Sequence, residues 1–152
     1  MINREEFANA LTHGLGAVLF IAAAPFLFFS LNSGGDQRSA LPVLIYVACL
    51  LFTYFASTIY HAVTMPDYKK KLRILDHVSI FLLIGGTFTP IVYFNMGSWN
   101  GWPFLIAFWS TMIGGVVFKI FFTGRFKLVS TLIYIGVAWF GAMMAAPIVK
   151  NI

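Results

Sequence analysis

No Asp, Glu, Lys or Arg occurs between His77 and Phe118, a stretch of 42 residues that reads HVSIFLLIGGTFTPIVYFNMGSWNGWPFLIAFWSTMIGGVVF. A helix needs about 20 predominantly apolar residues to cross the hydrocarbon core of a bilayer, and this stretch is roughly twice that length. Its middle is interrupted by turn-forming residues, Asn95-Met-Gly-Ser-Trp-Asn-Gly-Trp-Pro. The stretch therefore predicts two membrane-spanning helices joined by a turn.

Three further runs without charged residues have the length of a membrane span. They contain 29, 28 and 22 residues and cover Phe7–Gly35, Ser39–Pro66 and Leu128–Val149. We therefore expect one all-α integral membrane domain over residues 1–152, with five transmembrane helices at about 11–31, 41–64, 74–94, 103–122 and 129–149. A cleaved signal peptide is not expected, because the segment before the first run is net acidic and the run continues well past Ala22–Ala24.

The overall composition excludes several classes of protein. Charged residues make up 10% of the chain and hydrophobic residues 60%, and the mean hydropathy is +0.86. Soluble domains usually contain about a quarter charged residues. A disordered chain, a nucleic-acid-binding domain and an ordinary cytosolic enzyme are therefore excluded, and the expected partner is membrane lipid rather than nucleic acid. The lone cysteine, Cys49, lies in an apolar run and is expected to be a small packing residue.

The basic residues that give the net charge of +5 are distributed unequally between the two sides of the predicted bundle. Arg38 and Lys150 fall on one side, and the other eight fall on the side of the N-terminus: Arg4, Lys69, Lys70, Lys71, Arg73, Lys119, Arg125 and Lys127. Because cytoplasmic loops are enriched in Lys and Arg, this asymmetry predicts a cytoplasmic N-terminus and, with five spans, a C-terminus on the opposite face.

Individual charges and rings fit this orientation. Lys119 is expected to extend its amine to the cytoplasmic surface. The basic run from Lys69 to Arg73 is chiefly a topology signal, although it could attract anionic lipid at about 1 kcal/mol per residue. Tyr93, Trp99 and Trp102 cluster at the outer turn, where amphipathic rings favour the membrane interface.

Polar residues of three helices are predicted to lie at one depth, near the cytoplasmic ends of the spans. The first helix contributes Glu6, Asn9, Thr12 and His13, the second Ser57 and His61, and the third Asp76 and His77. Glu6, Asn9 and His13 have the i, i+3, i+7 spacing that places side chains on one helix face. Ionisable residues in or beside a span are costly, and their convergence, which includes all three histidines of the chain, indicates a functional site.

Each of these residues also has a structural interpretation. Asn3 could cap the first helix with Glu6 as the reciprocal partner in a capping box. Asp76 in a first helical turn is favoured by the helix dipole, and Ser57 could bond to the carbonyl of Thr53. An interfacial histidine is more often a hydrogen-bonded packing residue than a metal ligand. The convergence on three helices is what favours a site.

Four motifs carry a resemblance to a known family. Glu6-x-x-Asn9-x-x-Thr12-His13-Gly14, Ser57-x-x-x-His61, Leu75-Asp76-His77 and Gly86-Thr-Phe-Thr-Pro90 occur in the order and spacing of the hemolysin III family. That family belongs to the progestin and adipoQ receptor superfamily of seven-helix membrane proteins, which are similar to zinc-dependent amide hydrolases such as the ceramidases. The resemblance extends over the whole chain and also implies a bacterial cytoplasmic membrane.

The resemblance implies a role for each site residue. His61 matches a zinc ligand, Asp76 the acidic residue that holds a zinc-bound water, and Ser57 a serine that lines the site. His77 matches the histidine of the bacterial Asp-His pair, for which no ligand role is implied. The residues of the N-terminal motif are expected to support the site from behind: Glu6, Asn9, Thr12 and His13.

The resemblance also implies two further zinc ligands, from a His-x-x-x-His motif on the seventh helix. No histidine follows His77, so this sequence corresponds to the first five helices and its metal site is expected to be incomplete. A local alternative combines His13, His61 and His77, with Asp76 outside the metal's ligands. Zinc is accordingly the expected cofactor of the full-length protein.

The expected function is hydrolysis of lipid amides or esters in the inner leaflet. Three alternatives stay open: a pore-forming cytolysin, a non-enzymatic protein of membrane homeostasis, and an inactive fragment. The spans carry no charged stripe, which argues against a wide aqueous pore.

Overall fold

The computed structural model describes residues 3–33, 40–122 and 127–149, and all of its described regular elements are helices. The prediction of an all-α membrane protein is thereby confirmed. The helices are α1 (Arg4–Ser33), α2 (Ala40–Ala62), α3 (Pro66–Phe122) and α4 (Lys127–Val149).

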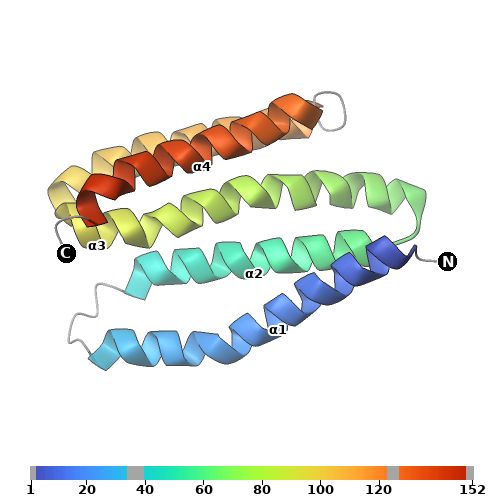
Figure 1. Ribbon diagram of the computed structural model, residues 1–152, viewed down its shortest axis with the longest axis horizontal. Coiled ribbons are helices and arrows are strands. Elements are labelled where there is room, and N and C mark those ends of the chain that lie inside the picture. The colour runs from blue at the N-terminus through green and yellow to red at the C-terminus, as the bar shows by residue number, and fades with distance from the viewer. Residues whose placement is uncertain (1–2, 34–39, 123–126, 150–152) are drawn as a thin grey trace.

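Helix α3 contains two apolar spans, Pro66–Met96 and Gly101–Phe122, which we call its first and second arms. Figure 1 shows α3 doubling back in its yellow segment, so that the arms run antiparallel. Contacts between distant residues follow from this reversal. The rings of Phe88 and Phe108 lie 5.2 Å apart, and the Trp109 Nε1–H donates to Thr89 Oγ1 over 3.0 Å.

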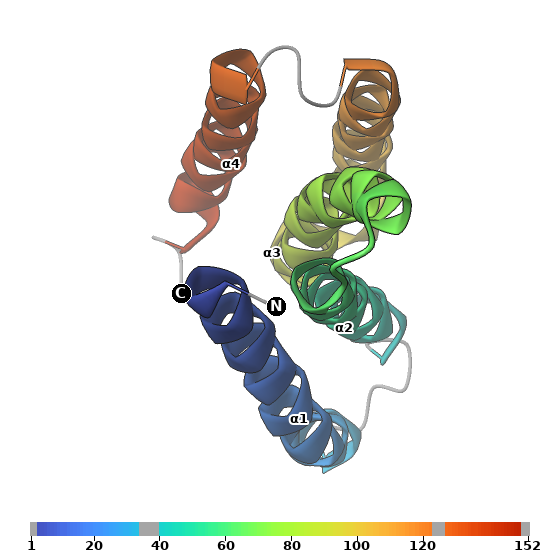
Figure 2. The same ribbon diagram turned by 90° about the vertical axis from the view of Figure 1, so that its right-hand side faces the viewer.

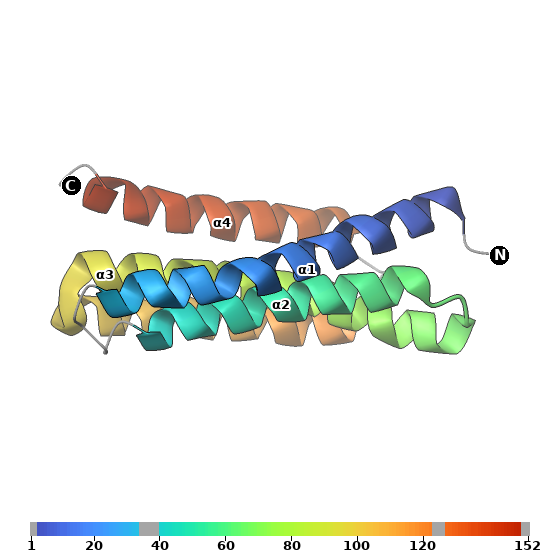
Figure 3. The same ribbon diagram turned by 90° about the horizontal axis from the view of Figure 1, so that it is seen from below.

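The helix ends are sorted between the two ends of the molecule. The start of α1, the end of α2, both termini of α3 and the start of α4 lie at one end, on the right of Figure 1. The end of α1, the start of α2, the bend of α3 and the end of α4 lie at the other, and Figure 3 shows the same arrangement from below. This is the alternation that successive spans of a membrane bundle produce.

Seen end-on in Figure 2, the helices follow an arc from α1 through α2 and α3 to α4, and the principal contacts join helices that are neighbours along the chain. The buried core lies between the two arms of α3 and is partly covered by α4. It consists of Phe81, Phe88, Phe108 and Met112, against which Ile133, Tyr134 and Val137 of α4 pack. Burial of aromatic rings therefore holds the reversal of α3 in place.

Glycines allow the closest approaches between these helices. A Cβ added to Gly86 would lie 2.7 Å from the Cβ of Cys49, so α2 and α3 could not pack at this distance with a larger residue. Gly115 similarly accommodates the ring of Phe81 from the other arm. Small residues serve this purpose in membrane bundles, and Cys49 is a packing residue, half-buried at the α2–α3 contact.

All the predicted helices are present, but two of them begin earlier in the chain than the sequence predicted. The first starts at Arg4 rather than near residue 11, and the third starts at Pro66 rather than near residue 74. Runs without charges locate the hydrocarbon-spanning part of a helix, whereas the helix itself continues into the polar interface where charged side chains are tolerated. The predicted ranges of these two helices therefore omitted their N-terminal segments.

Four segments are long and apolar enough to span a membrane: Arg4–Ser30, Ala40–Ala62, Pro66–Met96 and Gly101–Phe122. The fifth predicted span is confirmed as helix α4, although its apolar part among the described residues, Thr131–Met143, is shorter than a span. Large apolar side chains of α1 lie on the molecular surface, and Phe26 is 78% exposed. Such a surface suits contact with lipid or with other helices rather than with water.

At the bend of α3, two of the three predicted interfacial rings are in contact. Tyr93 and Trp102 lie edge to face with their centroids 6.4 Å apart, and Trp102 is half-exposed. The side chain of Trp99 lies outside the residues that the structure describes.

Candidate functional site

The end of the molecule that carries the N-terminus contains a cluster formed by three helices. Glu6 of α1 bonds through Oε2 to His61 Nδ1 of α2 over 2.9 Å, and the same oxygen accepts a hydrogen bond from Lys69 Nζ of α3 over 2.7 Å. The side chains of Glu6 and His61 are 28% and 16% exposed, so water screens the contacts only in part. We call Glu6, His61 and Lys69 the interhelical cluster.

The capping-box interpretation of Glu6 holds only for the cap itself. Asn3 Oδ1 accepts from the Glu5 N–H over 3.4 Å, and the Asn3 carbonyl accepts from the Phe7 N–H over 2.9 Å, which starts α1 at Arg4. The Glu6 carboxylate is directed instead to the other two helices. The cap and the interhelical contact therefore use different residues of the first turn.

Lys69 balances the charge of this cluster and also closes the end of α2. Its ammonium lies 3.4 Å from the Tyr60 carbonyl and 3.3 Å from the Val63 carbonyl, and it sits over the Tyr60 ring at 4.9 Å. The last carbonyls of a helix need such partners. Glu6 Oε2 therefore contacts both partners, the imidazole of His61 and the ammonium of Lys69.

His13 lies beside the interhelical cluster. Its ring is parallel to that of His61 with the centroids 6.1 Å apart, and it is also 6.1 Å from the ring of Tyr54. A Cβ on the next residue, Gly14, would meet Thr58 Cγ2 at 3.6 Å, an ordinary contact distance. Glu6, His13 and Gly14 of the N-terminal motif therefore lie against α2.

Ser57 and Asp76 lie at the same level of the α2–α3 contact. The Thr53 hydroxyl donates to the Ser79 carbonyl over 3.1 Å and thereby fixes the antiparallel register of the two helices. Ser57 follows Thr53 by one turn, and Asp76 precedes Ser79 by one turn. Because the two helices are antiparallel, both residues lie one turn closer to the interhelical cluster than the Thr53–Ser79 contact does. Ser57 is buried, and the side chain of Asp76 is 15% exposed.

His77 belongs to a second group of residues, on the side of α4. Its Nδ1 lies 3.9 Å from Asp76 Oδ2, which is beyond hydrogen-bond range, and its carbonyl accepts from the Tyr134 hydroxyl over 2.9 Å. Lys119 of the second arm lies over the Tyr134 ring at 5.5 Å and is only 4% exposed. The prediction that Lys119 extends its amine to the surface is therefore wrong, because the amine packs inside the protein. We call His77, Lys119 and Tyr134 the α4-side cluster.

Asn9 and Thr12 stand apart from both clusters. Both are exposed, and the Thr12 hydroxyl donates to the carbonyls of Ala8 and Asn9 in its own helix. These contacts use the hydroxyl within α1, as is common for threonine in helices.

Zinc sites need three protein ligands and an open position, and the described residues fit this requirement only in part. His61 fits as one ligand, because a metal-binding histidine usually donates its other ring N–H to a carboxylate, as His61 Nδ1 does to Glu6. Among residues 3–33, 40–122 and 127–149, no group of three or more His, Cys, Asp or Glu side chains could hold a metal ion. The local alternative that combined His13, His61 and His77 is therefore not assembled.

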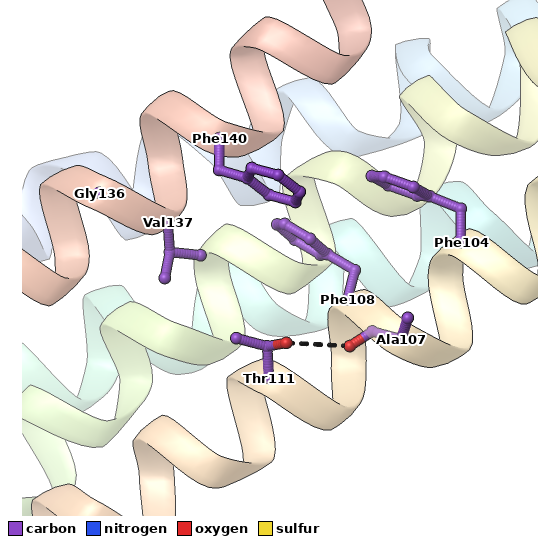
Figure 4. A pocket seen from close by; sticks show the side chains of 7 residues that line it. All are labelled: Phe104, Ala107, Phe108, Thr111, Gly136, Val137 and Phe140. Atoms are coloured by element: carbon purple, nitrogen blue, oxygen red, sulfur yellow. Dashed lines mark hydrogen bonds between the residues drawn. The ribbon is translucent and has the colours of Figure 1, made fainter.

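A cavity of about 410 Å³ lies elsewhere, between the second arm of α3 and α4. Figure 4 shows Phe104, Phe108, Val137 and Phe140 around it, while the Thr111 hydroxyl is bonded to the Ala107 carbonyl over 3.0 Å. No ionisable side chain lines this cavity. It offers an apolar surface and no catalytic group.

Three residues in these clusters were not predicted as site residues. Lys69 was assigned to topology, Lys119 was expected at the surface, and Tyr134 was given no role. Their roles depend on contacts between residues 57 and 63 positions apart, such as Tyr134 with His77 and Lys69 with Glu6. The position of Lys119 inside an apolar run was the one available signal, since a buried charge requires a partner.

The fold and the clusters define an all-α integral membrane protein whose polar side chains meet near one end of the bundle. The haemolysin-III related family model matches residues 1–152. The chain is 38% identical over 149 residues to Hemolysin-3 of Bacillus cereus, and 36% identical over 149 residues to the Hemolysin-3 homolog of Bacillus subtilis strain 168. These alignments cover 98% of this chain and 68% and 70% of the two relatives. No solved structure gives a significant match. The chain belongs to the haemolysin III family.

Proposed function

We propose that this protein is a zinc-dependent hydrolase of lipid amides or esters. The Glu6–His61 contact carries the proposal, because it joins a carboxylate and a histidine from different helices in the arrangement that orients metal-binding histidines. The family pattern assigns the remaining ligands to a His-x-x-x-His motif that this chain does not contain. His61 is proposed as one ligand of this site.

Each residue near this site has a chemical task in the proposal. Zinc, when bound, polarises a substrate carbonyl and lowers the pKa of water to about 7. Asp76 accepts a proton or holds water by a hydrogen bond. The Ser57 hydroxyl lies one helical turn from His61 and donates a hydrogen bond to the substrate. Glu6 fixes the ring of His61, and Lys69 fixes Glu6.

A lipid substrate is supported by the position of the residues. They lie near the ends of helices that are long and apolar enough to span a membrane, and large apolar side chains are exposed on those helices. We further propose that this end faces the cytoplasm across a bacterial plasma membrane, as the eight-to-two distribution of basic residues favours. A substrate would then reach the site by lateral diffusion within the inner leaflet.

The test measures zinc content and hydrolysis of a long-chain ceramide and of a matched lipid ester by the purified full-length protein. Chelation, His61→Ala and Asp76→Asn should each abolish hydrolysis, and His61→Ala should also lower the zinc content. Glu5→Gln is the control, since Glu5 is an exposed carboxylate next to Glu6. Hydrolysis that survives both chelation and His61→Ala would exclude the proposal.

Membrane lysis is a second candidate function, favoured by the name Hemolysin-3 that two relatives carry. A wide aqueous pore needs a polar lining, and the spans carry no charged stripe. Leakage of an entrapped dye from liposomes separates the two functions. Leakage that persists in His61→Ala and Asp76→Asn supports lysis, whereas zinc-dependent hydrolysis without leakage supports the hydrolase.

A further inference from the structure

A cavity of about 300 Å³ lies where α2 ends and α3 begins, and its lining combines cations with hydroxyl groups. Six residues line it: Tyr60, Thr64, Pro66, Lys69, Lys70 and Arg73. None of the six is acidic. Two hydroxyls, two ammonium groups and a guanidinium can all donate hydrogen bonds, so the lining is suited to a ligand that accepts them.

The charges in this lining are only partly compensated. Lys69 is paired with Glu6 at 2.7 Å and serves the interhelical cluster. The other ion pairs among the described residues join His61 to Glu6 and His77 to Asp76, so neither Lys70 nor Arg73 takes part in one. The cavity therefore keeps two positive charges that no acidic partner neutralises within the described part of the chain.

Arg73 gives a second indication of a ligand. Its Nε is buried and has no hydrogen-bond partner among the described residues. Buried N–H groups are rarely left unsatisfied, so this donor calls for an acceptor that the helices do not supply. Phosphate oxygens match the planar donor array of arginine better than a neutral carbonyl does.

The location agrees with this chemistry. The cavity opens at the first turns of α3, where Pro66 is the first helical residue and the helix dipole is positive. It also lies at the end of two segments that are long and apolar enough to span a membrane, Ala40–Ala62 and Pro66–Met96. Basic pockets between transmembrane helices are typical headgroup sites.

We propose that this cavity binds a phosphate group, carried by a lipid headgroup or free in solution, through Lys70 and Arg73. The phosphate accepts hydrogen bonds from the Arg73 guanidinium and the Lys70 ammonium, and Tyr60 and Thr64 line the same cavity. Lys69 remains bound to Glu6 and lines one side of the cavity. The inference does not depend on zinc or on the proposed hydrolysis.

The chain offers a matched control in the same basic run. Lys71 follows Lys70 directly, is exposed, and does not line the cavity. Lys71→Gln removes the same charge from the same segment as Lys70→Gln. If the basic run attracts anions only in a general way, both substitutions should weaken phosphate binding equally. If the cavity is a specific site, only Lys70→Gln should weaken it.

The experiment titrates the full-length protein in a neutral detergent with dioctanoyl phosphatidylglycerol, with inorganic phosphate, and with an uncharged dioctanoyl glycerol, and follows the thermal unfolding midpoint. Arg73→Gln and Lys70→Gln should each weaken binding of the phosphate-bearing probe about tenfold or more, the usual effect of losing a charge-assisted hydrogen bond. Lys71→Gln should stay within about twofold, and Arg73→Lys should restore part of the loss. The uncharged lipid should not bind at this site.

The outcomes separate the two sources of phosphate. Binding of phosphatidylglycerol alone assigns the site to a lipid headgroup, and equal competition by inorganic phosphate assigns it to the free ion. Two results overturn the proposal: the wild-type protein binds neither probe, or Lys71→Gln loses as much affinity as Arg73→Gln. Unliganded unfolding midpoints of all variants identify any that fail to fold, and Lys70→Gln, an exposed substitution, then provides the test.

Discussion

His61 and His77 each lie within 4 Å of a carboxylate, but one carboxylate belongs to another helix and the other to the adjacent residue. His61 receives Glu6 from another helix, 55 residues away in sequence, over 2.9 Å. His77 has Asp76 as its chain neighbour, and the closest contact is 3.9 Å. Successive residues of a helix point about 100° apart, so an adjacent carboxylate cannot align with the ring. The more distant residue in sequence makes the better hydrogen bond.

The surroundings of the two histidines differ in the same way. A lysine from a third helix neutralises Glu6 beside His61. Beside His77, Lys119 lies over the ring of Tyr134, and the Tyr134 hydroxyl bonds to the His77 backbone rather than to its ring. The interhelical cluster therefore orients an imidazole, whereas the α4-side cluster fixes a helix. This contrast supports the proposal that His61, rather than His77, is the metal ligand.

The largest effect is expected when the carboxylate behind His61 is removed. Glu6→Ala should lower the zinc affinity of the full-length protein by about 10- to 100-fold, as loss of such a partner commonly does. Competition with a zinc chelator of known affinity measures the change. Glu5→Ala, which removes an exposed carboxylate of the same helical turn, should leave the affinity unchanged. Equal affinity in Glu6→Ala and the wild type would contradict the orienting role.

Stability should respond to the charge of Glu6 as well. Glu6→Gln leaves the Lys69 ammonium half-buried without its counter-charge and should lower the free energy of unfolding by about 1–2 kcal/mol, a value reduced for partial exposure. Denaturant unfolding in detergent provides the measurement, with Glu5→Gln as the matched control. If the two variants were equally stable, Glu6 would not be joining the three helices.

The α4-side cluster predicts a smaller and purely structural effect. Tyr134→Phe removes the hydrogen bond to the His77 carbonyl and should cost about 1 kcal/mol of stability. Zinc affinity should stay the same, because His61 belongs to the other cluster. Tyr68→Phe removes a hydroxyl from an exposed ring and should change neither quantity. A drop in zinc affinity in Tyr134→Phe would show that the two clusters are coupled.

The sequence predicted the helices, and it selected the candidate site residues, from local patterns. The charge-free run from His77 to Phe118 defines two spans whatever the rest of the chain does, and the spacing of Ser57 and His61 places them on one face of α2. The starts of α1 and α3 were missed because charged residues such as Glu6 and Lys69 remain helical in the interface.

Pairing between helices could not be predicted in the same way. The register between α2 and α3 depends on the Thr53–Ser79 hydrogen bond and on the close fit of Gly86 against Cys49. The α1 pairing depends in turn on the bonds of Glu6 to His61 and Lys69, and the α4 pairing on the bond of Tyr134 to the His77 carbonyl. Motif order brings the residues to one depth, but only the packing of side chains divides them between two clusters.

The smallest predicted effect concerns Thr12, which is compared with Thr53. Both threonines lie in helices, but only Thr53 bonds to a second helix. The Thr12 hydroxyl bonds only to carbonyls of its own exposed helix segment, so Thr12→Val should change the free energy of unfolding by less than about 0.5 kcal/mol. The Thr53 hydroxyl bonds to Cys49 in α2 and to Ser79 in α3, and Thr53→Val should cost about 1 kcal/mol. Unfolding of both variants in the same detergent gives the comparison. Equal costs would mean that the α2–α3 register does not depend on Thr53, and the level of Ser57 relative to Asp76 would then have to be fixed by the glycine contacts.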